Sequence, residues 1–165
     1  MTTPMLILVV EDNLMNSAFI TAVLEPEGHV LMVARTGPEG LAAALSNTFD
    51  LILLDIELPG LRGDAICMQL RSAGVRTPMV ALTASAMPDE LALLGTAGFD
   101  EVVTKPVEPT QLRALACRYG RQSDRVEPAD PVRSRVAGRI VTPIGSIPGD
   151  DQGTHVRPRP AERTP

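Results

Sequence analysis

Short runs of consecutive apolar residues recur along the first part of the chain, and segments long enough to form a helix separate them. The first run, LILVV at 6–10, is continuous and rich in β-branched residues, which is typical of a strand buried on both faces of a parallel sheet. Similar runs follow at 29–34, 51–54, 78–82 and 101–104. This pattern predicts five parallel strands, each joined to the next by a helix.

Residues that commonly begin or end helices stand at the ends of the intervening segments. The predicted helices cover 14–24, 39–45, 64–71, 89–97 and 108–118. The residues expected to begin them are Asn13, Thr36, Pro38, Asp64, Pro88 and Pro109, and those expected to end them are Gly74, Gly98 and Gly120. Five strands that alternate with helices predict an α/β domain with a five-stranded doubly wound parallel sheet.

The composition of the chain changes after Tyr119. Residues 1–119 carry 14 acidic and 7 basic residues, whereas residues 120–165 carry 6 acidic and 8 basic residues, 7 of the 15 prolines, and no Leu, Met or aromatic residue. We therefore predict one domain at 4–119 and a disordered Pro- and Arg-rich tail at 120–165. Because acidic residues are interleaved with the arginines and no aromatic stacking platform is present, we expect no nucleic acid partner.

Several classes of protein do not fit this sequence of 165 residues. No apolar run reaches the roughly 18 residues that a membrane span needs, so a membrane protein is excluded. The first residues lack the basic segment and long apolar stretch of a signal peptide, and two cysteines make no disulfide framework, so a cytoplasmic location is expected.

Polar residues follow four of the five predicted strands. Glu11 and Asp12 follow the first strand, Asp55 ends the third, Thr83 ends the fourth and Lys105 follows the fifth. The carboxyl ends of parallel strands meet at one edge of a doubly wound sheet, where ligands bind. We therefore expect three carboxylates, one hydroxyl and one ammonium to lie close together at this edge.

Three carboxylates in a small space repel one another unless a cation lies among them or one is protonated. Mg²⁺ is the expected cofactor because it prefers oxygen ligands and shares its coordination shell with phosphoryl oxygens. Thr83 and the single lysine of the chain, Lys105, would then contact the remaining oxygens of a phosphoryl group. Asp55 is predicted to attack phosphorus and form an acyl phosphate.

The sequence resembles the receiver domains of two-component response regulators over 6–118. The resemblance rests on VEDN at 10–13, LILLDIELPG at 51–60, ALTA at 81–84 and TKP at 104–106. It implies the flavodoxin-like receiver fold, whose five parallel strands have the order 2-1-3-4-5. It also implies Mg²⁺ ligands from Glu11, Asp12, Asp55 and the backbone carbonyl of Glu57, phosphorylation at Asp55, phosphoryl contacts from Thr83 and Lys105, and a cis peptide bond before Pro106.

The resemblance also implies a conformational switch and protein partners. In the family, the residue equivalent to Thr83 is coupled to a side chain on the fifth strand; Val102 occupies that position here, where most relatives with this switch carry Tyr or Phe. The implied phosphodonor is a histidine kinase or a histidine phosphotransfer protein that docks near Leu14, Met15 and Ala18. A downstream protein would receive the signal.

Two other functions remain open from the sequence. The first is a scaffold that keeps the fold but binds its partners without phosphorylation, which Val102 and the tail make plausible. The second is a Mg²⁺-dependent phosphohydrolase with an aspartyl nucleophile. Enzymes of the latter type typically carry a second aspartate two residues after the nucleophile, where this chain has Glu57. We therefore expect a protein that accepts a phosphoryl group and is not a turnover enzyme.

Overall fold

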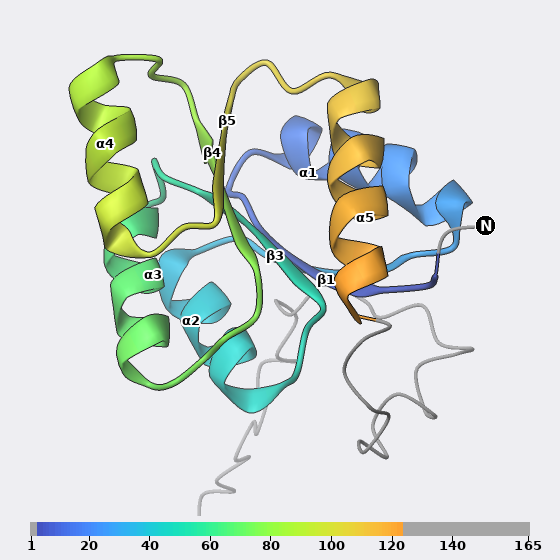
Figure 1. Ribbon diagram of the computed structural model, residues 1–165, viewed down its shortest axis with the longest axis horizontal. Helices are drawn as coiled ribbons and strands as arrows, with labels where there is room; N and C mark the ends of the chain where they lie inside the picture. Colours follow the sequence, from blue (N-terminus) through green and yellow to red (C-terminus); the bar gives the residue numbers. More distant parts are fainter. Residues whose placement is uncertain (1–2, 124–165) are drawn as a thin grey trace, which may run out of the picture.

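The computed structural model describes residues 3–123 as five strands that alternate with five α-helices, plus one short 3-10 helix (Figure 1). The elements are β1 (Leu6–Val10), α1 (Leu14–Leu24), η1 (Glu25–Glu27), β2 (Val30–Ala34), α2 (Gly37–Ser46), β3 (Leu51–Asp55), α3 (Gly63–Ser72), β4 (Met79–Thr83), α4 (Pro88–Ala97), β5 (Glu101–Thr104) and α5 (Pro109–Ser123). The strands form one parallel sheet of order β2-β1-β3-β4-β5, which confirms the predicted fold. The disordered tail was predicted at 120–165; residues 120–123 belong instead to α5, and residues 124–165 lie outside the described residues.

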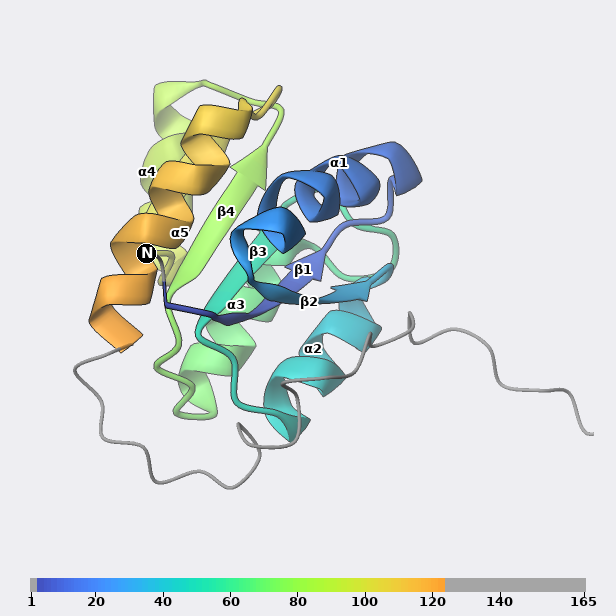
Figure 2. The same cartoon turned by 90° about the vertical axis from the view of Figure 1, so that its right-hand side faces the viewer.

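Helices cover both faces of the sheet (Figure 2). Successive residues of each strand point to opposite faces, so each strand contributes to two apolar cores. On one face, Leu8, Ile52 and Ala81 belong to the core that also contains buried residues of α2, α3 and α4. On the other face, Ile7 and Leu53 belong to the core that contains buried residues of α1 and α5. The continuous apolar runs of the sequence therefore reflect strands buried on both sides.

The observed helix boundaries confirm some predicted end signals and correct others. The Asn13 side chain accepts hydrogen bonds from the first turn of α1, and the Thr36 hydroxyl accepts one from Glu39 N. The prediction that Asp64 begins a helix is wrong, because α3 already starts at Gly63. The prediction that Gly120 ends the last helix is also wrong, because α5 continues to Ser123.

Packing explains why α5 does not stop at Gly120. Glycine inside a helix costs roughly 0.5–1 kcal/mol relative to alanine, a preference that tertiary contacts readily overcome. Gly120 is buried, and a Cβ built on it would lie 3.6 Å from the sulfur of Met5. The helix therefore passes over the segment that leads into β1. Three strands also differ from the prediction by one residue: β2 begins at Val30 rather than His29, β3 extends to Asp55, and β4 covers 79–83 rather than 78–82.

None of the helices between residues 3 and 123 combines the length and apolar character that a membrane span requires. Both cysteines of the described chain are free thiols. Burial raises the pKa of the Cys67 thiol to about 11, so at neutral pH this side chain is a protonated apolar group of the core.

His29 is a buried side chain that makes the stability of the fold depend on pH. Its Nδ1 accepts a hydrogen bond of 3.3 Å from Met5 N, and its Nε2 has no hydrogen-bond partner among the described residues. Burial lowers the pKa of His29 below its ordinary value, although the charges of Glu27 and Asp50 partly oppose this. The imidazole is therefore neutral in the folded chain at neutral pH, with Nδ1 acting as an acceptor.

Acidification is expected to destabilise the fold through His29. The unfolded chain takes up a proton below about pH 6.5, whereas the folded chain resists protonation, so stability falls as the pH drops below that value. Urea denaturation at pH 7.5 and 5.5 measures this loss. In His29→Gln, a side-chain oxygen can still accept from Met5 N without titrating, so this variant should lose less stability between the two pH values. Equal losses in both proteins would contradict the assignment.

Candidate functional site

Three carboxylates gather at the carboxyl ends of β1 and β3, as the sequence predicted. One oxygen from each of Glu11, Asp12 and Asp55 lies within 4.8 Å of the others. Glu11 is 1% exposed and Asp55 3% exposed, whereas Asp12 is open to solvent. The cluster therefore has two carboxylates set into the protein and one at its mouth.

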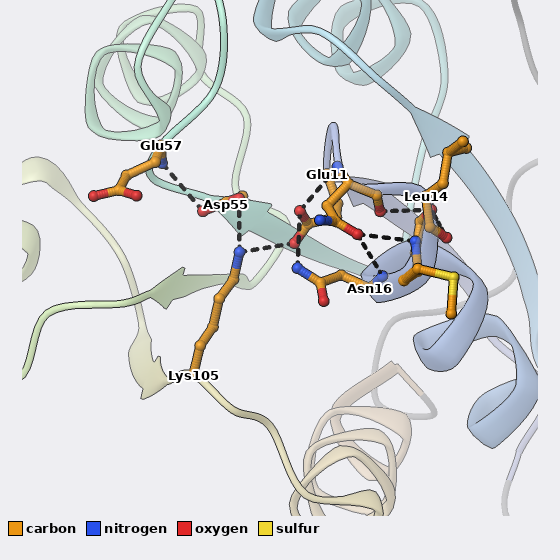
Figure 3. Close-up of polar contacts among 9 residues, drawn as sticks. Glu11, Leu14, Asn16, Asp55, Glu57 and Lys105 are labelled. Carbon is orange, nitrogen blue, oxygen red and sulfur yellow. Dashed lines mark hydrogen bonds and ion pairs between the residues drawn. The ribbon is translucent and has the colours of Figure 1, made fainter.

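Lys105 joins the two buried carboxylates (Figure 3). Its Nζ donates a hydrogen bond of 2.7 Å to Asp55 Oδ2 and one of 2.9 Å to Glu11 Oε2. The residue follows β5 and precedes a cis peptide bond to Pro106. Parallel strands β1, β3 and β5 thus deliver an acid, a second acid and an ammonium to one place, across a sequence separation of 94 residues between Glu11 and Lys105.

The charges of these groups depend on one another. Burial raises the pKa of Glu11, and the charge of Asp55 raises it further, while the hydrogen bond from Lys105 acts in the opposite direction. Burial would lower the pKa of Lys105, but its hydrogen bonds to Asp55 and Glu11 outweigh burial and raise it. Lys105 is therefore an ammonium ion. When all three carboxylates are ionised, one ammonium leaves the cluster with an excess of negative charge, which a divalent cation could neutralise.

Two asparagines of the α1 region hold the other oxygen of Glu11. Asn13 N donates to Glu11 Oε1 at 3.2 Å, and Asn16 Nδ2 donates to the same atom at 3.3 Å. Asn13 was expected from the sequence as a helix cap, but the contact of Asn16 with the acidic cluster was not. An amide placed in the first turn of the helix after the acidic pair is the signal that could have identified it. Both oxygens of Glu11 are therefore held by hydrogen bonds.

Glu57 contributes its backbone to the site. Glu57 N donates to Asp55 Oδ1 at 3.1 Å, so both oxygens of Asp55 accept hydrogen bonds. The Glu57 side chain is exposed and points away from Asp55 (Figure 3). Its carboxylate is not one of the three that gather in the cluster. Any contribution of Glu57 to a metal would thus come from the backbone, as the family resemblance implies.

Thr83 and Val102 lie on the same face of the sheet as the helices α2, α3 and α4. Thr83 is buried at the end of β4, and its Oγ1 accepts a hydrogen bond of 3.1 Å from Ser85 N. It is opposite Thr104 in the register, and Ala81, two residues earlier, is opposite Val102. Val102 is partly buried and packs against the core of that face. The two side chains are therefore diagonal neighbours on adjacent strands.

Residues 7–116 match the family of response regulator receiver domains. Because this match covers most of the chain, the protein belongs to the response regulator receiver family. Its acidic triad, Glu11, Asp12 and Asp55, is the one typical of the Mg²⁺ site of two-component receivers. The family typically carries phosphorylation signals rather than acting as turnover enzymes.

Curated relatives carry this domain as one part of longer proteins. The chain is 41% identical over 109 residues to the response regulator ArlR of Staphylococcus saprophyticus, an alignment that covers 66% of this chain and 49% of ArlR. It is 38% identical over 118 residues to the sensor histidine kinase AruS of Pseudomonas aeruginosa, which covers 69% of this chain but 12% of AruS. The chain thus spans half or less of these relatives.

Solved receiver structures match the fold along almost their whole length. The receiver domain of the sensor histidine kinase PA1611 from Pseudomonas aeruginosa is 30% identical, with a TM-score of 0.66 and coverage of 72% of this chain and 98% of that one; its active-site cleft coordinates a magnesium ion. A CheY-like receiver domain protein from Methanospirillum hungatei is 26% identical, with a TM-score of 0.69 and coverage of 74% and 98%.

Proposed function

We propose that this receiver accepts a phosphoryl group on Asp55 from a histidine kinase or a histidine phosphotransfer protein. The observation that carries the proposal is that the buried Asp55 carboxylate bonds to the partly buried ammonium of Lys105 and lies close to the carboxylates of Glu11 and Asp12. An Asp55 carboxylate oxygen attacks the phosphorus of the donor phosphohistidine in line. The new P–O bond forms as the P–N bond breaks, and the bonding electron pair leaves with the imidazole nitrogen.

The residues of the site fit a Mg²⁺ ion as the cofactor. Glu11, Asp12 and Asp55 supply oxygen atoms close enough to share one hard cation, and the cluster needs positive charge. When bound, Mg²⁺ offsets the negative charge of the phosphoryl oxygens. Lys105 holds Asp55 in place before transfer and is positioned to contact a phosphoryl oxygen afterwards. We assign the backbone carbonyl of Glu57 as a further ligand.

The proposed output is phosphorylation-dependent binding of a downstream protein. A phosphoryl group on Asp55 adds negative charge and three acceptor oxygens beside the end of β4. The Thr83 hydroxyl, whose oxygen now accepts a hydrogen bond from Ser85 N, can donate its proton to this group, and its movement would shift the loop after β4. Val102, diagonal to Thr83, is the side chain that can respond to such a movement. The domain proposed for this function covers 4–119.

Incubation with acetyl phosphate and Mg²⁺ is expected to add one phosphoryl group to the chain. Intact mass spectrometry should show this adduct in the wild type, no adduct in Asp55→Asn, and no adduct when EDTA removes the metal. Asp89→Asn is the matched control, because Asp89 is exposed on α4 and lies outside the acidic cluster. An adduct retained in Asp55→Asn would contradict the assignment of the phosphoacceptor.

A binding measurement separates this function from that of a constitutive scaffold. If signalling depends on phosphorylation, the affinity for a downstream partner should change when the wild type is phosphorylated and should not change in Asp55→Asn. A partner that binds both proteins equally, with or without acetyl phosphate, would support the scaffold instead. Val102 makes this comparison informative, because its side chain is smaller than the aromatic residue found in most relatives with this switch.

A further inference from the structure

The two faces of the sheet are covered unequally. Three helices, α2, α3 and α4, pack on one face, whereas α1 and α5 alone pack on the other (Figure 2). On the first face, α2 packs against the edge strand β2. On the second face the strand lies beside α1, and no further helix among residues 3–123 covers it there. Among the described helices, α1 alone therefore borders β2 on this face.

A groove of about 460 Å³ lies at this position, between α1 and β2. Leu14, Ala18 and Ala22, spaced four residues apart on one side of the helix, line it together with Leu31 and Val33 from alternate positions of the strand. Leu14 is 54% exposed, and both alanines are exposed. Small alanine side chains allow the axis of another helix to approach closely. Ser17 and Thr21 also line the groove, so a helix that packs there meets an apolar strip with two hydroxyl groups beside it.

The two ends of the groove carry opposite charges. Arg35 follows β2 and lies at the end where α1 begins, because β1 leads into α1 and Val10 is paired with Ala34 in the sheet. Glu25 lies at the other end, immediately after the last residue of α1. A fitting occupant is an uncharged apolar helix of similar length that carries an acidic residue at its C-terminal end and runs antiparallel to α1.

α1 itself has the properties required of this occupant. Its sequence, LMNSAFITAVL, contains no charged residue, and Glu25 follows directly. We propose that two copies of the chain associate through this surface about a twofold axis, with each α1 lying in the groove of the other copy. Antiparallel α1 helices then bring Glu25 of each copy next to Arg35 of the other, so that every contact occurs twice. The arrangement therefore pairs opposite charges at both ends of the interface.

This association has a consequence that rests on the proposed function. In the dimer each α1 is covered, so a donor protein that docks on α1 competes with the second copy, whereas a small donor such as acetyl phosphate does not. The dimer itself does not depend on phosphorylation. A measurement on the unphosphorylated chain without Mg²⁺ therefore tests it separately from the phosphoacceptor chemistry.

Sedimentation velocity of the full chain, from micromolar to sub-millimolar concentration, is the first test. We expect a reversible monomer–dimer equilibrium. Ala18→Asp places a charge in the groove and should abolish the dimer, while Ala42→Asp, on the exposed side of α2, should leave it intact. A circular dichroism melt of both variants shows that they remain folded. A chain that is monomeric at every concentration, or a dimer that survives Ala18→Asp, overturns the proposal.

Charge reversal tests the antiparallel arrangement. Glu25→Arg or Arg35→Glu alone places like charges together at both ends of the twofold interface, and each should weaken dimerisation about tenfold. The chain with both reversals restores opposite charges across the interface and should recover the affinity of the wild type. A double variant that is weaker than either single variant contradicts the predicted pairing.

Discussion

Replacing Gly63 with alanine is expected to destabilise the protein by about 2–3 kcal/mol and to slow phosphorylation of Asp55. A Cβ on Gly63 would lie 2.2 Å from the carbonyl oxygen of Asp55 and 2.9 Å from the Cα of Ile56. These are backbone atoms, so no side-chain rotation can relieve the overlap. The start of α3 would have to move away from the end of β3 and weaken the hydrogen bond from Gly63 N to Ile56 O, now 3.1 Å.

This displacement affects chemistry because it begins at the proposed phosphoacceptor. The segment between β3 and α3 starts with Ile56 and Glu57, and Glu57 N donates to Asp55 Oδ1. A shift of this segment changes the orientation of the carboxylate. We therefore expect a lower rate of acetyl phosphate adduct formation at saturating donor, in addition to the loss of stability, since small errors in the position of a nucleophile reduce the rate strongly.

Gly95→Ala is the matched control for this substitution. Gly95 lies inside α4 with no positive φ, and no atom is found within 4 Å of a Cβ built on it. Alanine there should stabilise the protein by roughly 0.5–1 kcal/mol, because glycine is unfavourable in a helix. Urea denaturation compares the two variants. Gly63→Ala is expected to lower the free energy of unfolding and Gly95→Ala to raise it. Equal stabilities of the two variants would show that the close contact at Gly63 does not affect stability.

The strands and helices could be predicted because they depend on local patterns. A run such as Leu51–Leu54 is apolar at every position and too short for a helix, which is typical of a strand covered on both faces. Strand ends are also local, so the sequence predicted that Asp55 and Lys105 would meet at one edge. Because the carboxyl ends of parallel strands lie at the same edge of the sheet, the contact between these two distant residues follows from the strand positions alone.

Contacts that depend on packing could not be predicted in this way. Arg71 is an example, because its guanidinium donates to the carbonyl oxygens of Gly98, Val75 and Thr77 and to the Asp100 carboxylate. In the sequence it is an ordinary basic residue in the last turn of a helix. The wrong prediction that α5 ends at Gly120 has the same cause. Packing against the segment around Met5 keeps Gly120 in the helix, although glycine has a low helix propensity.

Within the site, the sequence indicated which groups would gather but not how they are bonded. Three acids and one lysine at strand ends allow several pairings, and the choice depends on depth in the protein. Glu11 and Asp55 are buried and share Lys105, whereas Asp12 is exposed and stays outside this pairing. The contact of Asn16 with Glu11 was not predicted, because polar residues in the first turn of a helix are common as capping residues.

Lys105→Met is expected to abolish formation of the phosphoryl adduct and to lower stability by about 3 kcal/mol at neutral pH without Mg²⁺. The substitution keeps an apolar stem of similar length but removes the ammonium that bonds to two buried carboxylates. Glu11 and Asp55 then remain in a poorly hydrated environment with only neutral donors. Urea denaturation and intact mass spectrometry measure the two effects.

The stability loss of Lys105→Met should shrink under two conditions. Burial already raises the pKa of Glu11, and removal of the ammonium raises it further, so a falling pH protonates Glu11 and relieves the uncompensated charge. Added Mg²⁺ should also stabilise this variant more than the wild type, because the cation replaces the missing positive charge. A penalty that is independent of pH and of Mg²⁺ would show that packing, rather than charge, is lost.

Lys105→Arg separates the charge of Lys105 from its shape. The guanidinium keeps the positive charge beside Asp55 and Glu11, so most of the stability lost in Lys105→Met should return. It is planar and bulkier than an ammonium, which is compact enough to contact a single phosphoryl oxygen in a narrow site, so adduct formation should remain impaired. A stable chain that fails to accept phosphate would assign the charge of this residue to folding and its compact geometry to catalysis. Recovery of both stability and adduct formation would show that positive charge alone suffices. The presence of lysine at this position, in a chain whose other 14 basic residues are arginine, would then have no chemical reason.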